Sequence, residues 1–220
     1  MAKYGWQNGT CSERHQCNLE SNGRGKKRCL FQGLLYSLPT LWCNKHSMQQ
    51  LVFNKQTKHI GLSNFNCQHI RQILSIARVR PTSLQIECHP HLSQSKLIRF
   101  AREAGIRVSA FSCLGGASYL SIGMATDNDL LFDNPDIRKI CHKHNKTAAQ
   151  VLLRWAMQRN TLPINKSSSK KRMIENRGVF DFYLTKEEME SIDSLNLNRR
   201  YNDPGHFCEE GMGTFCPIYE

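Results

Sequence analysis

The sequence has no apolar run of about 18 residues, the length that a membrane-spanning helix needs. Its first segment, residues 1–19, also lacks the continuous apolar core of a secretory signal. Ten cysteines are present, but none occurs as Cys-x-x-Cys. Scattered cysteines without a secretory signal favour free thiols in a reducing compartment. We therefore expect a cytoplasmic protein with no membrane partner.

Acidic residues are scarce near the N-terminus. Residues 1–60 carry nine Lys or Arg and two Asp or Glu, a balance of +7, whereas residues 61–220 carry 21 and 16, a balance of +5. Such a surplus can attract polyanions such as nucleic acid. Because no nucleic-acid-reading motif accompanies it, we favour a solvated basic segment over a nucleic-acid-binding module.

Residues 1–57 show little hydrophobic periodicity, and we expect an irregular, mostly disordered segment. One short helix is expected near its end, from the apolar residues Leu41, Met48, Leu51 and Val52. Cys11-x-x-x-His15-x-Cys17, together with Cys29, is an alternative zinc site, but its spacing matches no common finger. We therefore assign no metal ligands.

Strand-like and helix-like segments alternate over residues 58–220, the second expected domain. We expect strands at residues 58–62, 82–87, 106–111 and 161–164, and helices at residues 67–77, 93–104, 136–144, 147–159, 169–176 and 185–195. This alternation favours parallel strands joined by right-handed crossovers, in a doubly wound sheet or a β/α barrel. Because no Gly-x-Gly-x-x-Gly follows any strand, the usual dinucleotide fingerprint of the doubly wound sheet is missing.

Four short segments cover the ends of the expected strands and the residues that follow them. They are His59-Ile-Gly-Leu-Ser-Asn-Phe-Asn66, Gln85-Ile-Glu-Cys-His-Pro90, Val108-Ser-Ala-Phe-Ser112 and Ile164-Asn-Lys-Ser-Ser168. In this order they resemble strands five to eight of the aldo-keto reductases. Arg200-Tyr-Asn-Asp-Pro204 is similar to the xylose and polyol reductases of that family.

The resemblance implies the C-terminal half of a (β/α)8 TIM barrel, an incomplete barrel of four parallel strands with helices. In the family an Asp, a Tyr, a Lys and a His on strands two to four carry the catalysis. Residues 1–37 contain no matching motif, so we assign no catalytic residue and expect a truncated, inactive chain. Since four strands cannot close a barrel, self-association through the open half-barrel is expected.

The resemblance also implies a site for a nicotinamide nucleotide at the strand exits. Ser63, Asn64 and Gln85 correspond to the residues that bind the carboxamide, and Phe111 corresponds to the aromatic residue that stacks on the ring. An ordinary strand cap and an ordinary core phenylalanine are the alternative interpretations. Ser112 and Leu114 continue the same loop, where Cys113 replaces the usual proline.

A second part of the same expected site follows the last strand. By resemblance Lys166, Ser167, Ser168 and Arg172 bind the adenosine 2′-phosphate, and Glu175 and Asn176 contact the adenine. A solvated basic helix start is the alternative. The phosphate site predicts NADP(H) over NAD(H).

Three functions are therefore considered. The first is NADP(H)-dependent reduction of a carbonyl in an aldose- or polyol-like substrate. The second is a non-catalytic relative that binds nucleotide or a protein partner. The third is a basic nucleic-acid-binding protein, which rests on charge alone. For the chain as written we favour the second.

Overall fold

The computed structural model describes residues 48–203 and residue 213. These residues belong to one compact unit, which spans Gln32–Glu220. Residues 48–53 are helical, so the short helix expected around Met48, Leu51 and Val52 is present. Leu41 and the zinc candidates lie outside the described residues.

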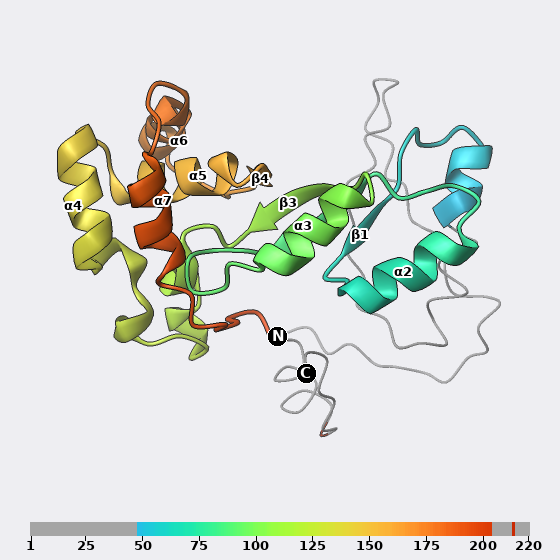
Figure 1. The fold of residues 1–220 in the computed structure, drawn as a ribbon, viewed down its shortest axis with the longest axis horizontal. Coiled ribbons are helices and arrows are strands. Elements are labelled where there is room, and N and C mark those ends of the chain that lie inside the picture. Colours follow the sequence, from blue (N-terminus) through green and yellow to red (C-terminus); the bar gives the residue numbers. More distant parts are fainter. Residues whose placement is uncertain (1–47, 204–212, 214–220) are drawn as a thin grey trace. The chain divides into compact units, whose positions relative to one another are not determined.

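Four parallel strands form one sheet in the order β1-β2-β3-β4. They are β1 (Gly61–Ser63), β2 (Ser83–Glu87), β3 (Arg107–Phe111) and β4 (Thr161–Pro163). Each strand lies beside the next one in the chain (Figure 1), the arrangement that helical crossovers produce. All four expected strands are present, although β1 begins at Gly61 rather than at residue 58 and ends at Ser63, because only Gly61, Leu62 and Ser63 pair with β2.

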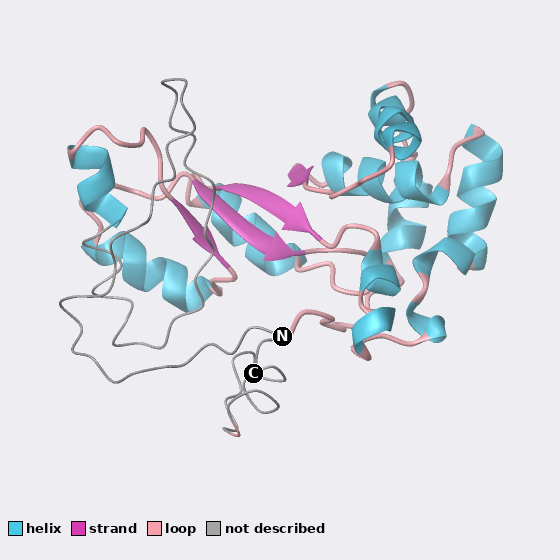
Figure 2. Cartoon of the chain, turned by 180° about the vertical axis from the view of Figure 1, so that it is seen from behind, coloured by secondary structure: helices cyan, strands magenta, loops and turns pink. Residues whose placement is uncertain are grey.

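One face of the sheet packs against a helix, and the other carries a row of mainly polar residues. Leu84 and Val108 are buried, and α3 (Ser95–Glu103) packs against β3. Figure 1 draws α3 in front of the strands, and Figure 2, seen from behind, draws the strands in front of it. Because side chains alternate along a strand, the opposite face carries the register row of Ser63, Gln85, Ser109 and Leu162.

The remaining helices agree with the expected ranges to within one or two residues. They are α2 (Cys67–Ile76), α4 (Pro135–His144), α5 (Ala148–Gln158), α6 (Lys170–Arg177) and α7 (Lys186–Asp193). Thr147 and Thr185 each complete a capping box at the start of α5 and α7. Of the helices that the structure describes, none combines the length and the hydrophobicity needed to span a bilayer.

Helix α3 starts two residues later than the expected range 93–104, and Ser93, the first residue of that range, does not cap it. The cap position is held by Gln94, whose φ of 49° is left-handed and whose side chain makes no capping hydrogen bond. The backbone N–H of Ser93 instead donates to Asn196 Oδ1 at 3.0 Å, and Gln94 Nε2 donates to the carbonyl of Glu87 at 2.6 Å. Contacts to distant parts of the chain therefore outweigh the local capping preference.

The long connection after β3 contains four short 3-10 turns. They are Gly115–Ser118, Leu120–Ile122, Asp127–Asp129 and Leu131–Asp133. Gly115 has a φ of +77°, and a Cβ built there would lie 2.6 Å from Leu131 Cδ1. Glycine therefore permits both the turn and its close packing on Leu131.

Candidate functional site at the carboxyl ends of the strands

The exits of β1 and β2 lie side by side. Ser63 and Gln85 are partners in the parallel register, and the backbone N–H of Asn64 donates to the carbonyl of Gln85 at 2.8 Å. Asn64 has a left-handed φ of 58°, which asparagine tolerates better than most residues. Its Nδ2 donates to Ser63 Oγ at 3.4 Å. The structure thus brings together the three polar residues expected to bind a carboxamide.

Phe111 ends β3 on the same side of the sheet as this group. It is the register partner of Glu87 and lies two residues beyond Ser109, so it shares the face of Gln85. Its side chain is only half-buried. Ser112 follows with a left-handed φ of 55°, and its Oγ lies 2.6 Å from the hydroxyl of Tyr119.

Cys113 and Leu114, which follow Ser112, pack into the hydrophobic core. Leu114 is partly buried and packs against the core. Cys113 is fully buried, and its Sγ donates to the carbonyl of Ala110 at 3.1 Å. Burial raises the pKa of the Cys113 thiol to about 12. The cysteine therefore fills the place of the expected proline as a neutral, packed side chain.

The exit of β4 leads into α6 through a polar turn. Ser169 caps α6, where its side chain accepts from the N–H of Arg172, and Ser167 Oγ accepts from the N–H of Ser169 at 3.2 Å. Lys166, Ser168 and Arg172 are exposed. Neither Lys166 nor Arg172 forms an ion pair with any residue that the structure describes. Lys166 and Arg172 are thus exposed cations beside the N-terminus of α6.

Glu175 has a structural contact that the sequence did not indicate. Its Oε1 accepts from Thr147 Oγ1 at 2.8 Å, and its carbonyl accepts from Gln150 Nε2 at 2.7 Å. These two bonds dock α6 onto the first turn of α5. Asn176 beside it is half-buried. The adenine contact of Glu175 and Asn176 stays a prediction.

Two buried amide atoms at these exits have no hydrogen-bond partner within the described part of the chain. They are Oδ1 of Asn64 and Nδ2 of Asn165. A buried polar atom without a partner costs about 1–3 kcal/mol, so a bound polar group would relieve that cost. The chemistry of Asn64 Oδ1 fits a donor such as the NH₂ of a carboxamide.

Sequence reasoning missed a buried carboxylate at the end of β2. Glu87 is fully buried, and it accepts the N–H groups of Tyr201 at 2.8 Å and Asn202 at 3.1 Å. His89 Nε2 lies 3.0 Å from its Oε1, and Arg200 forms an ion pair with it at 3.6 Å. A charged residue between the apolar residues Ile86 and Cys88 was the available signal, because a buried charge requires partners.

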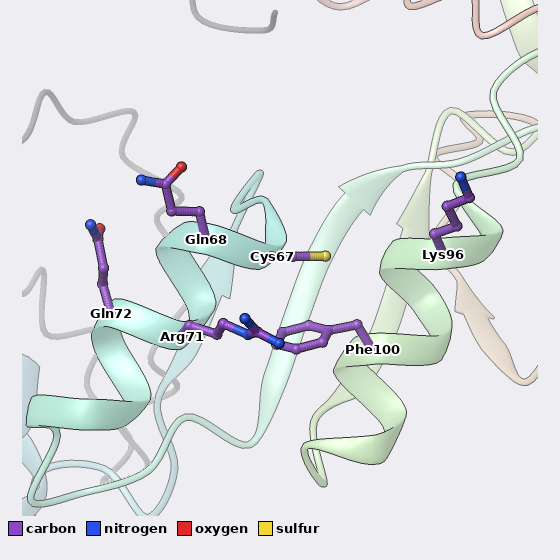
Figure 3. A pocket seen from close by; sticks show the side chains of 6 residues that line it. All are labelled: Cys67, Gln68, Arg71, Gln72, Lys96 and Phe100. Atoms are coloured by element: carbon purple, nitrogen blue, oxygen red, sulfur yellow. The ribbon is translucent and has the colours of Figure 1, made fainter.

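One hollow among the described residues lies away from these exits. It has a volume of about 580 Å³ and lies between α2 and α3 (Figure 3). Its lining consists of Cys67, Gln68, Arg71, Gln72, Lys96 and Phe100. Arg71 lies over the ring of Phe100, 5.5 Å from its centroid. None of the expected site residues lines this hollow.

Comparisons with known proteins agree on one family. A family model described as the aldo/keto reductase family matches residues 47–197. A probable NAD(P)H-dependent D-xylose reductase xyl1 of Aspergillus clavatus is 45% identical over 182 residues, covering 79% of this chain and 55% of that protein. Aldo-keto reductase family 1 member A1 of Gallus gallus is 44% identical over 158 residues, covering 72% and 48%.

A solved structure supports the same relationship. MGS-M4, an aldo-keto reductase enzyme from a Medee basin deep-sea metagenome library, is 28% identical with a TM-score of 0.68, covering 76% of this chain and 58% of that chain. The present chain spans about half the length of the curated relatives it matches.

Proposed function

Because the chain belongs to the aldo/keto reductase family, we propose that the carboxyl ends of its four strands bind the nicotinamide nucleotide NADP(H). The resemblance drawn from the strand exits is confirmed by the family match, and the four parallel strands form part of a (β/α)8 barrel. The family chemistry is oxidoreduction, in which the bound nucleotide supplies or accepts a hydride.

The proposal rests on the alignment of polar and aromatic residues at the exits of β1, β2 and β3. Ser63 and Gln85 are register partners, and Phe111 lies on the same face of the sheet. The half-buried ring of Phe111 offers a flat surface for stacking. Ser63, Asn64 and Gln85 supply both donors and acceptors for a carboxamide. Their role in this chain would be to bind and orient the nicotinamide ring.

NADP(H) is proposed over NAD(H) because of the exposed cations near α6. Lys166 contributes a point charge, and Arg172 can bind a phosphate through two parallel hydrogen bonds. Ser167 and Ser168 lie between them, next to the N-terminus of the helix, where anions are favoured. Relatives described as NAD(P)H-dependent are consistent with either nucleotide, so the preference rests on these side chains.

For the reaction itself we propose nucleotide binding without turnover by this chain. Its sequence has no counterpart of the family's Tyr, Lys and His proton-transfer motifs in residues 1–37. The alternative is reduction of an aldose-like carbonyl, which is supported by the D-xylose reductases among the relatives. NADPH oxidation in the presence of D-xylose separates the two, because steady turnover by the purified chain contradicts the non-catalytic proposal.

A fluorescence titration with NADPH and NADH tests the nucleotide site. Hydrogen bonds to charged groups contribute about 1.5–3 kcal/mol, so Arg172→Ala should weaken NADPH binding about tenfold to hundredfold and leave NADH binding nearly unchanged. Arg177→Ala is the matched control, because Arg177 is an exposed arginine at the other end of α6. Equal losses for both nucleotides, or no binding by the unmodified chain, would contradict the proposal.

A further inference from the structure

The segment that follows α7 packs against the carboxyl end of β2. Its central residue, Tyr201, is 1% exposed. The backbone N–H groups of Tyr201 and Asn202 both donate to the buried carboxylate of Glu87. Because these bonds compensate a charge that has no access to water, they fix the position of the segment.

The ring of Tyr201 lies between two other aromatic rings. It stacks on His89 with 4.8 Å between ring centroids and an interplanar angle of 28°. It also stacks on Tyr119 with 5.8 Å between centroids and an angle of 26°. The Tyr201 ring therefore joins the loop after β2 to the loop after β3.

The hydroxyl of Tyr201 joins the same two loops a second time. It donates to Asp129 Oδ1 at 3.3 Å and lies 2.7 Å from His91 Nδ1. A carboxylate can only accept, so the phenol is the donor toward Asp129, whereas the direction of the bond with His91 Nδ1 depends on which ring nitrogen of His91 carries the proton. Burial, followed by the charge of Asp129, raises the pKa of Tyr201, so the hydroxyl stays protonated and remains a donor.

Tyr119 connects Tyr201 to the proposed nucleotide site. The hydroxyl of Tyr119 lies 2.6 Å from Ser112 Oγ, and Ser112 has a left-handed φ of 55°. A serine in this region of φ needs surrounding contacts to hold it there. Tyr201 contacts the connection after β3 at two points, Tyr119 and Asp129, one near each end of the 3-10 turns.

We infer that Tyr201 is a positioning residue that holds the 112–132 connection against the sheet and thereby orients Ser112 and Phe111 toward a bound nicotinamide nucleotide. The second half of this inference rests on the proposed function, and the first half does not. Tyr201 acts through Tyr119 and Asp129 rather than by contact with the nucleotide.

Tyr201→Phe separates this role from ordinary packing. The variant keeps the ring and its stacking on His89 and Tyr119, but it loses the bond to Asp129 and leaves buried His91 Nδ1 without its phenol partner. Asp129 stays anchored by Thr126, whose N–H donates to Oδ2 at 2.8 Å. Tyr183→Phe is the matched control, because Tyr183 is 71% exposed and its ring contacts Arg154 instead.

Hydrogen exchange of the full chain, measured without nucleotide, is the first readout. In Tyr201→Phe the amides of residues 112–132 should exchange about tenfold faster. The native state then has about one net hydrogen bond fewer, so this connection opens locally more often. Amides of α4 and α5 should be unchanged, and Tyr183→Phe should match the unmodified protein. Tyr119→Phe is a second variant, with faster exchange expected around Ser112 alone.

NADPH titration of the same proteins is the second readout, with affinity expected to fall about threefold or more in Tyr201→Phe. Unchanged exchange in residues 112–132, or a uniform increase across the chain, overturns the inference. Faster local exchange with unchanged NADPH affinity overturns its second half. If the unmodified chain binds no NADPH, the proposed function fails, and the exchange result alone decides whether Tyr201 holds the connection.

Discussion

Replacing Glu188 by glutamine tests how strongly one buried carboxylate joins α7 to α4. The Glu188 side chain is 9% exposed, and Lys143 Nζ lies 2.7 Å from its Oε1. His144 Nε2 lies 2.9 Å from Oε2, which also accepts the N–H of Thr185 at 2.8 Å. Every one of these contacts favours the ionised form of the carboxyl group.

The resulting pKa sets the size of the effect. Burial opposes ionisation, but the hydrogen bonds from Lys143, Thr185 and His144 outweigh it and lower the pKa of Glu188 to about 2. A lowering from 4.5 to about 2 corresponds to about 3 kcal/mol, at about 1.4 kcal/mol per unit. Because the folded pKa is depressed, this stabilisation is present above pH 4.5 and is lost as the pH falls toward 2.

Urea unfolding at pH 6 and pH 3 measures this contribution. Linkage predicts that the unmodified protein loses about 2 kcal/mol more than Glu188→Gln over this interval. Fluorescence is a suitable signal, because Trp155 is buried and its Nε1 donates to Asp193 on α7. Glu190→Gln is the control, since Glu190 lies on the same helix with a side chain that is 67% exposed.

Parallel losses of stability in Glu188→Gln and the unmodified protein would refute this reasoning. They would mean that Glu188 titrates near its ordinary pKa and that its contacts in the fold do not favour the charged form. A steeper pH dependence in Glu188→Gln would contradict the sign of the effect.

Two further predictions concern the connection after β3 and the thiols. Gly115→Ala should lower the free energy of unfolding by at least about 1 kcal/mol, because it places a Cβ at a φ of +77° against Leu131; thermal denaturation measures this. In the native protein at pH 8, iodoacetamide should modify the partly exposed Cys67 before Cys88 and Cys113, as peptide mass spectrometry can follow. Burial raises the pKa of Cys88 to about 11 and of Cys113 to about 12, so equal rates would contradict their burial.

The order of the helices and strands could be predicted because each rests on neighbouring residues. Thr147 and Thr185 begin α5 and α7 through capping boxes that each span four residues. Asn145 ends α4 in a left-handed conformation with a φ of 51°. Where a distant partner intervened, the predicted boundary was displaced: α3 begins at Ser95 rather than at Ser93, whose N–H donates to Asn196.

Part of the proposed site could likewise be predicted from the sequence, and part of it could not. The residues at the strand exits, among them Ser63, Gln85 and Phe111, could be identified from the sequence through its resemblance to the family, and parallel strands bring their carboxyl ends to one edge. The docking of α6 through Glu175 and Thr147 could not, because the two residues are 28 positions apart and neither pattern indicates the other.

By itself the sequence determined the alternation of strands and helices, most of their ends, and the polar residues that follow each strand, because these depend on spacings of a few residues. Only the tertiary structure decided that Glu87 binds the backbone at Tyr201, 114 positions away, and that Tyr201 joins two loops. A buried charge predicts that partners exist, but which backbone groups supply them depends on how the whole chain folds.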